Sequence, residues 1–483
     1  MCVCALSLLC VFFFLFPIFF RREKKRKEKN TISFIIKPII TAYYYFIITK
    51  TRQDKRKRDT DKMNMDTKEV EKDVVERFCR YVQVETTSDP DSETCPSSVK
   101  IFDLARILER ELRELGVSDV RLDEEHCVVY GTLKSNAGEG AVRGIGVAAH
   151  MDTSPDVSGK DVKPEIHTVD GATMAGRGLH LAGGDVTIGW EDLARFDGQR
   201  IITSDGTTLL GADDKSGIAI VMSAVAYMQA HPSVRHPDVH IVFNPDEEIG
   251  RGTEGMDIEW LKERTECMYT VDGGDLGTLE TETFNAYGAV LKVEGVCKHP
   301  GYGYKAMANA GQIAADFCAR LPAGQRPETT RGREGYIALC SLTGSFESAK
   351  ASFILRSFEM EEIAQFRATM DGVAAQLREE NPLATISLEY AFQYPNMKTK
   401  LKQSAVDAAM DAYKRAGITP VVESIRGGTD GSTLTEAGVS CPNLFSGAVN
   451  FHSRREFVPI PTMVKGVEAV VALAEVWAER IYG

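Results

Sequence analysis

The sequence lacks several patterns that would place it in common classes of protein. Its eleven cysteines are scattered, and no pair of CxxC motifs has zinc-finger spacing. No internal repeat is visible, and neither glycine nor proline is frequent enough for a low-complexity chain. With 43% hydrophobic and 26% charged residues in 483 positions, the composition predicts a globular protein of two or three domains in a reducing compartment.

Outside the first 62 residues, acidic side chains outnumber basic ones. Those residues carry 15 Lys and Arg against 5 Asp and Glu, so the formal net charge of −12 leaves the rest of the chain near −22. An acidic body of this kind argues against nucleic acid as a partner.

The first 62 residues also differ in hydrophobicity from the rest of the chain. The apolar run 3–20 is long enough to span a bilayer, and basic residues follow it, whereas they precede the apolar run of a secretory signal. Three interpretations stay open: a membrane anchor, a targeting segment, and a leader included by starting the gene model too early. We favour the last, because Met63 and Met65 immediately precede a sequence typical of a globular N-terminus.

The remaining chain alternates between predicted strands and helices. Short apolar runs that end in polar residues predict buried strands at 144–149, 239–243, 268–271 and 441–445. Apolar residues at helical spacing predict helices at 67–82, 101–115, 218–228 and 461–481, with Ser97 or Ser98 as N-cap of the second. The alternation predicts an α/β fold with an open, parallel or mixed sheet, where sites form at the carboxyl ends of strands. Between 285 and 394 the pattern becomes that of an inserted α+β module.

Five segments that follow strands or precede helices hold candidate functional residues. They are AHMDT with His150 and Asp152, GADDKSG with Asp213 and Asp214, NPDEEIG with Asp246, Glu247 and Glu248, VDGG with Asp272, and NFHSRREF with His452. Crowded carboxylates need cations or protons in order to coexist. Two histidines among several carboxylates form a ligand set suited to zinc.

Each segment alone also has a structural interpretation. The pair His150 and Asp152 fits a hydrogen-bonded strand end, Asp213 or Asp214 fits the N-cap of the next helix, and NPDEEIG fits a solvated acidic loop. These alternatives stay open for the separate motifs. Their joint occurrence favours a metal site.

A longer set of motifs resembles a known family. AHMDTSPD, TLLGADDKSGIA, NPDEEIG, YTVDGG, KHPG, RGGTDGS and PNLFSG resemble, in this order, the motifs of the peptidase T family. That family lies within a wider group of two-zinc exopeptidases and deacylases that includes carnosinase and aminoacylase. The resemblance spans about Met65 to Gly483. It implies a zinc-exopeptidase-like catalytic domain with a central mixed sheet at 63–284 and 395–483, and an inserted α+β lid and dimerisation domain at 285–394.

The resemblance also implies roles for individual residues. Asp213 would bridge two Zn²⁺ ions per subunit, with His150 and Asp272 completing one coordination shell and Glu248 and His452 the other. Asp152 would orient His150, and Glu247 would act as general base and acid. The residues implied to bind substrate are His299, Asn309, Arg356 and Arg426, of which Arg356 also fits a solvated or ion-paired strand position. Ser453, Arg455 and Asp275 depart from the family pattern without removing an implied ligand.

The predicted function is that of a cytosolic tripeptide aminopeptidase of peptide catabolism. It would hydrolyse the N-terminal peptide bond of short peptides as a homodimer. Two alternatives remain, namely another two-zinc dipeptidase or deacylase, and a catalytically silent peptide-binding homologue. A membrane-anchored form requires that the apolar run 3–20 be part of the mature protein.

Overall fold

The computed structural model describes residues 65–138 and 143–483. The predicted extension 1–62, with its interpretations as anchor, targeting segment or gene-model leader, lies outside the described residues. Among the described helices, none combines the length and the apolar character needed to cross a membrane.

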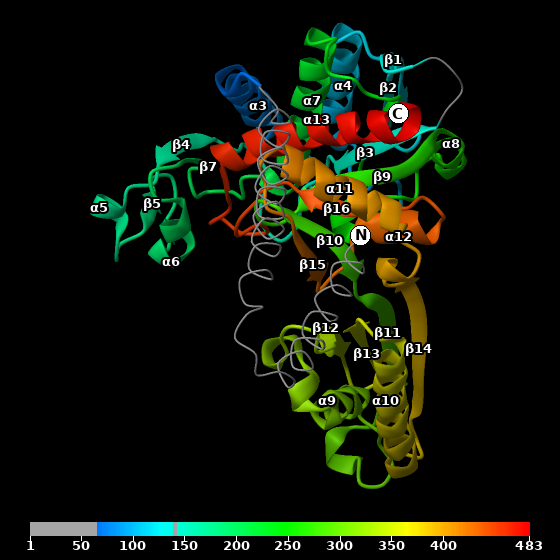
Figure 1. Cartoon of the computed structure of the whole chain (residues 1–483). Helices are drawn as coiled ribbons and strands as arrows, with labels where there is room; N and C mark the ends of the chain where they lie inside the picture. Colours follow the sequence, from blue (N-terminus) through cyan, green and yellow to red (C-terminus); the bar gives the residue numbers. More distant parts are fainter. Residues whose placement is uncertain (1–64, 139–142) are drawn as a thin grey trace, which may run out of the picture. The chain divides into compact units, whose positions relative to one another are not determined.

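An eight-stranded mixed sheet is the largest sheet of the described chain (Figure 1). Its order is β1-β2-β8-β3-β9-β16-β10-β15. β3 is parallel to β8 and β9, and β9 is parallel to β16, whereas β2 and β8, and likewise β10 and β16, pair antiparallel. The strands are β1 Ser118–Asp123, β2 Val128–Leu133, β3 Gly144–His150, β8 Val239–Asn244, β9 Thr265–Gly273, β10 Thr278–Thr283, β15 Val421–Ile425 and β16 Asn443–Phe445.

Helices cover both faces of this sheet because side chains alternate along its strands. In β3, Ile145, Val147 and Ala149 pack into one core, whereas Ala148 packs into the other. The first core includes α3 Thr67–Tyr81, α4 Ile101–Glu114, α7 Ala212–Ala230, α11 Gln403–Arg415 and α13 Ile460–Tyr482, and the second includes α8 Ile258–Arg264 and α12 Asp430–Glu436. Burial of each large aliphatic side chain contributes about 1.5–3 kcal/mol. The predicted α/β class with a central mixed sheet is confirmed.

The predicted N-cap of α4 is wrong. The helix begins after Lys100 without a side-chain cap. Ser97 is instead bound by Asp246, whose carboxylate accepts the Ser97 N–H at 2.6 Å and its hydroxyl at 2.5 Å. A hydrogen bond to a charged carboxylate is stronger than one to a neutral acceptor. Ser97 therefore bonds to Asp246 and does not cap α4.

A separate antiparallel sheet, ordered β12-β13-β11-β14, lies within residues 285–394. Helices α9 and α10 pack on it and complete a core of their own (Figure 1). The elements are β11 Asn285–Glu294, α9 Ala310–Arg320, β12 Tyr336–Gly344, β13 Ser348–Ser357, α10 Met360–Glu380 and β14 Thr385–Tyr394, with 3₁₀ turns at η3 Pro300–Tyr302, η4 Ala323–Gln325 and η5 Pro327–Thr329.

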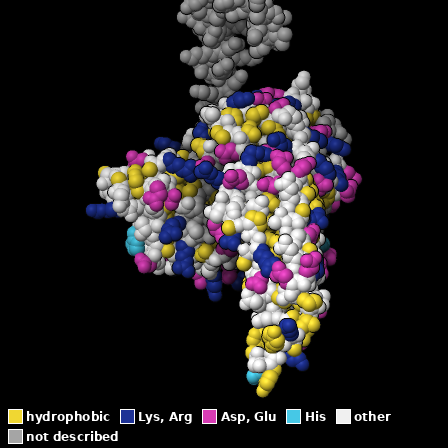
Figure 2. Space-filling model, turned by 90° about the horizontal axis from the view of Figure 1, so that it is seen from below, with side chains coloured by type: hydrophobic (Ala, Val, Ile, Leu, Met, Phe, Trp, Pro, Cys, Tyr) yellow, Lys and Arg dark blue, Asp and Glu magenta, His cyan; other side chains and the backbone are white. Residues whose placement is uncertain are grey.

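Two small sheets, which the sequence did not predict, complete the described fold. Their orders are β17-β7-β4 and β5-β6. The elements are β4 Glu165–Thr168, α5 Gly171–Met174, β5 Leu179–Leu181, β6 Val186–Ile188, α6 Trp190–Leu193, η1 Ala194–Phe196, β7 Arg200–Thr203 and β17 Phe457–Pro459. On the coloured part of the face in Figure 2, acidic and basic side chains are interspersed and are not gathered by sign.

Candidate metal centre and active site

Parallel strands bring most of the predicted site residues to one edge of the large sheet. His150 is the last residue of β3, and Asp272 is the second-last residue of β9. Glu247 and Glu248 begin η2 (Glu247–Ile249), which follows β8. Because β3, β8 and β9 run parallel, their carboxyl ends lie side by side, where α/β folds place ligands.

Asp213 stands between the two predicted histidine ligands. Its Oδ1 lies 3.1 Å from Nε2 of His150, and its Oδ2 lies 3.4 Å from Nε2 of His452. His150 Nε2 is also 3.6 Å from Oδ1 of Asp272, and His452 Nε2 is 2.8 Å from Oε2 of Glu248. The five side chains therefore form two sets that share one carboxylate.

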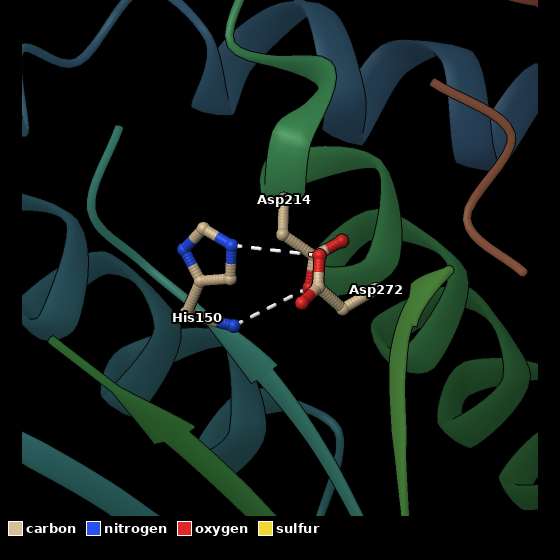
Figure 3. A group of neighbouring side chains, drawn as sticks. All are labelled: His150, Asp214 and Asp272. Carbon is tan, nitrogen blue, oxygen red and sulfur yellow. Dashed lines mark hydrogen bonds and ion pairs between the residues drawn. The ribbon is translucent and has the colours of Figure 1, made fainter. Parts of the chain in front are cut away.

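The adjacent acid, Asp214, has a different environment. Figure 3 shows the His150 imidazole facing Asp272 and the His150 backbone N–H facing Asp214. Asp214 accepts that N–H at 3.3 Å and the Gly217 N–H at 3.1 Å. Asp214 thus caps a turn near the start of α7. The Asp213 carboxylate accepts no backbone N–H among the described residues. Asp214, His150 and Asp272 also have ligand atoms within 4.8 Å of one another.

Electrostatics of the cluster suit bound cations. Burial and the nearby Asp213 raise the pKa of Asp272 well above its usual range, and the same two causes raise the pKa of Glu248 to about 7. Burial alone would raise the pKa of Asp213, but hydrogen bonds with His150 and His452 hold it below its usual value. Glu248 Oε1 is buried without a hydrogen-bond partner in the described chain. An orphaned oxygen among mutually repelling carboxylates and two imidazoles fits divalent metal ions.

Asp152 ties two of the strand ends together. Its side chain is fully buried, and its Oδ1 lies 3.3 Å from Nδ1 of His150. The same carboxylate accepts the backbone N–H groups of Glu247 and Glu248, each at 3.1 Å. Asp152 therefore fixes the His150 ring and the backbone that carries both glutamates.

Glu247 and four of the five candidate ligands line one cavity of about 310 Å³. Its lining includes Asp213, Glu248, Asp272 and His452. The Glu247 carboxylate accepts no hydrogen bond within the described chain, and burial followed by the charge of Asp272 raises its pKa well above the usual value. A carboxylate that faces the cavity without a protein donor is free to exchange protons.

Glu456 is a site residue that sequence reasoning missed. Its fully buried carboxylate accepts the backbone N–H groups of Leu210, Gly211 and Asp213 at 2.7, 2.8 and 3.0 Å. Burial raises its pKa to about 7. The residue connects the loop of His452 to that of Asp213. The sequence feature that could have identified it is its place four positions after His452 in the motif NFHSRREF.

Glu280 is a second residue that was missed. It belongs to β10 and lines the same cavity as the carboxylate and histidine cluster. Its Oε2 accepts a 2.6 Å hydrogen bond from Asn443 Nδ2. The sequence offered only an alternating strand, TLETET, in which nothing marked this glutamate.

The predicted substrate-binding residues do not line that cavity. His299 Nδ1 accepts the Gly301 N–H, and Asn309 caps α9 through the Gln312 N–H, each at 3.2 Å. Arg356 donates to the carbonyls of Tyr287 and Leu355. Arg426 donates to the carbonyls of Gly332 and Glu334 and to the hydroxyl of Thr330.

Comparisons with known proteins agree with this architecture. The family model "Peptidase family M20/M25/M40" matches residues 204–476. Peptidase T of Desulfitobacterium hafniense (strain DSM 10664 / DCB-2) is 42% identical over 413 residues, which cover 84% of this chain and 98% of the relative. The identity and coverage confirm the predicted resemblance to peptidase T.

Solved structures share the fold. Aminopeptidase PepT from Bacillus cereus ATCC 10987 has a TM-score of 0.65 at 23% identity, over 84% of this chain and 99% of that chain. A tripeptidase from Staphylococcus aureus subsp. aureus Mu50 has a TM-score of 0.66 at 20% identity, over 85% and 99%. A Bacillus subtilis protein described as a dinuclear metal binding peptidase from the M20 family has a TM-score of 0.57 at 13% identity, over 85% and 99%. The chain belongs to the peptidase family M20/M25/M40 and, within it, to the peptidase T group.

Proposed function

We propose that this chain is a tripeptide aminopeptidase that holds two Zn²⁺ ions per subunit. The observation that carries the proposal is Asp213, which presents one oxygen to His150 at 3.1 Å and the other to His452 at 3.4 Å. In a chain that is 42% identical to a peptidase T, this shared carboxylate supports a centre for two ions. Imidazole and carboxylate ligands suit zinc.

The residues divide into two metal shells. His150 and Asp272 would hold one ion, Glu248 and His452 would hold the other, and Asp213 would contribute to both shells. When bound, the pair of ions would lower the pKa of water and polarise the carbonyl of the scissile peptide bond.

Glu247 would carry the proton transfers. Its carboxylate faces the cavity and is free of protein donors, so it would take a proton from the attacking water and deliver it to the nitrogen of the leaving amine. Asp152 would hold His150 in one orientation and would keep the Glu247 backbone in place through its 3.1 Å hydrogen bond.

The segment 285–394 would act as the lid domain inserted between catalytic segments 63–284 and 395–483. His299, Asn309 and Arg356 from this segment, together with Arg426, would bind the backbone and the terminal carboxylate of a short peptide. Neither arginine is ion-paired to a carboxylate in the described chain, and their guanidinium groups donate to carbonyl or hydroxyl oxygens. A peptide carboxylate would be a stronger partner for such a planar fork.

Assembly and location are part of the same proposal. β12 is an edge strand with exposed Leu339, Leu342 and Phe346 on or beside it, which favours pairing with a second copy. We place the homodimer in the cytosol, because its scattered cysteines suit a reducing compartment. Sedimentation and cell fractionation test these two points.

The activity is tested with the purified full chain and one free tripeptide, with and without Zn²⁺. Release of the first residue should depend on zinc and should stop when the tripeptide is N-acetylated. Cleavage of the acetylated peptide would favour the deacylase or dipeptidase alternative. Zinc bound at two ions per chain without turnover of either peptide would favour the silent peptide-binding homologue.

A further inference from the structure

Glu280 places a carboxylate on the cavity wall beside the predicted metal ligands. The residue comes from β10, which is separated from the Asp272 strand β9 by β16. The cavity that it lines also contains Glu247, Asp213 and Asp272. None of the roles assigned above uses this carboxylate.

The position of Glu280 is fixed relative to Asp272. Asn443 donates its Nδ2 to Oε2 of Glu280 at 2.6 Å, while its Oδ1 accepts the Asp272 N–H at 3.1 Å. Glu280 Oε1 lies 3.4 Å from the Gly274 nitrogen, and a Cβ built on Gly273 would lie 3.2 Å from Oε2. That Cβ would first meet the carbonyl oxygen of Leu444 at 2.8 Å, so strand β16 requires the glycine more strictly than Glu280 does.

This carboxylate has no cationic partner. Among the described residues, no Lys, Arg or His nitrogen forms an ion pair with Glu280. Neighbouring acids differ, since Glu282 pairs with Arg333 and Lys398, and Asp275 pairs with Arg195. Removing an unpaired carboxylate from water costs free energy that an arriving cation offsets. A cavity wall with such a group favours a ligand that brings a positive charge.

A free peptide brings this charge on its α-amino group. The α-nitrogen lies about 2.5 Å from the carbonyl carbon of its own residue, as the backbone bond lengths and angle require. A group that binds the ammonium must therefore lie beside the residues that act on that carbonyl. Glu280 meets this condition because its carboxylate accepts the Gly274 N–H and lines the same cavity as Glu247 and Asp272.

We propose that Glu280 binds the protonated α-amino group of the substrate's first residue and thereby selects peptides with a free N-terminus. This inference rests on the proposed aminopeptidase function and names the residue that makes the enzyme act at the N-terminus of a peptide. Asn443 is the positioning residue, because it links the ammonium-binding carboxylate to the backbone of Asp272.

The test compares Glu280→Gln with Glu423→Gln in the full, zinc-loaded chain. Glu423 is the cross-strand neighbour of Glu280 on β15, is exposed and does not line the cavity, so its variant removes the same charge outside the site. Each protein is assayed on Leu-Gly-Gly and on 4-methylpentanoyl-Gly-Gly, which lacks only the α-amino group. Calorimetry with leucine and with 4-methylpentanoate gives a second readout that needs no turnover.

Glu280→Gln should lower kcat/KM for the free tripeptide about 10- to 100-fold, chiefly through KM, as expected for loss of one charge-assisted hydrogen bond. The des-amino peptide should be unaffected, the preference for leucine over 4-methylpentanoate should shrink by a similar factor, and zinc content should not change. Glu423→Gln should behave as the unmodified protein.

The inference is overturned if Glu280→Gln lowers kcat/KM equally for the two peptides and affinity equally for leucine and 4-methylpentanoate. It is also overturned if the variant keeps the full preference for the compound with the α-amino group. Failure of the unmodified chain to cleave Leu-Gly-Gly counts against the aminopeptidase function instead. In that case the calorimetric comparison still decides whether Glu280 recognises an α-ammonium group.

Discussion

The metal-ligand cluster and the residues proposed to contact substrate belong to two differently built regions. At the edge of the eight-stranded sheet, the carboxylates of Asp152 and Glu456 accept five backbone N–H groups from segments that carry site residues. In the four-stranded sheet and its connections, His299, Asn309 and Arg356 bond to their own surroundings. The first region is preorganised for chemistry, whereas in the second the proposed contacts would require these side chains to exchange local partners for substrate.

The connection between the regions is itself polar and buried. Asn396 Oδ1 accepts the Thr283 N–H, and its own N–H donates to Oδ1 of Asn285 at 2.9 Å. Glu282, one residue before this connection, pairs with Arg333 at 2.8 Å and with Lys398 at 3.2 Å. The two segments that join the sheets, at 282–285 and 396–398, are therefore held by hydrogen bonds and ion pairs. Substitutions can alter these contacts without changing a residue of the metal-ligand cluster.

The largest effect is expected in the preorganised region, from Glu247→Gln. Loss of the general base should lower kcat about 10²- to 10⁴-fold, because a glutamine cannot carry the proton. Zinc content, measured by atomic absorption, should stay at two ions per chain, since Glu247 is not a proposed ligand. Glu423→Gln is the control. A variant that keeps its kcat would remove Glu247 from the mechanism.

A smaller effect is expected when the link between the two ligand loops is weakened. Glu456→Gln retains the shape but not the charge that orders the N–H groups of Leu210, Gly211 and Asp213, so zinc affinity should fall about 10- to 100-fold. Chelator competition measures the affinity. Glu468→Gln on α13 removes another buried glutamate, one that pairs with Lys465, and should leave zinc binding unchanged. Equal losses in both variants would indicate a general loss of stability.

This contrast also explains which residues the sequence could predict. His150, Glu247, Glu248 and Asp272 follow apolar runs with strand character, and parallel strands bring such positions together. Asp213 and Asp214 could not be told apart, because adjacent acids before a helix have the same local pattern. The structure separates them, since Asp214 binds the Gly217 N–H.

Other features depend on partners far away in the sequence. Glu280 gains its place in the cavity from Asn443, which is 163 residues further along the chain. Glu456 acts on segments 243 to 246 residues before it. The small sheets were missed because strands of three or four residues are too short to show a period.

In the second region, Arg356→Ala should impair substrate binding without affecting the metal. If its guanidinium binds the peptide carboxylate, KM for a tripeptide should rise about tenfold, and zinc content should not change. Arg320→Ala, which removes an exposed arginine paired with Glu380 on the same module, is the matched control. An unchanged KM would mean that Arg356 serves only its carbonyl partners, Tyr287 and Leu355.

The smallest effect concerns the connection between the regions and its dependence on pH. The hydrogen bond from Arg333, with those from Ser424 and Lys398, lowers the pKa of Glu282 to about 2 from its usual 4.5. A lowered folded-state pKa means that the unfolded chain binds the proton more readily. The stabilisation is therefore fully present above about pH 4.5 and is lost as the pH falls toward 2. Because Arg333 and Lys398 are 54% and 64% exposed, solvent screening keeps the contribution modest.

Urea unfolding of the unmodified chain and of Glu282→Gln, compared at pH 6, 5, 4 and 3, measures this contribution. The difference between their midpoints should narrow as the pH falls, since protonated Glu282 resembles glutamine. When Glu282→Gln is compared in an Arg333→Ala background, the midpoint difference at pH 6 should be smaller, because the hydrogen bond that does most to lower the pKa of Glu282 is then absent. A midpoint difference that stays constant from pH 6 to pH 3 would mean that the connection does not depend on the Glu282 charge. The hydrogen bonds of Asn285 and Asn396 would then be what holds the four-stranded sheet to the catalytic one.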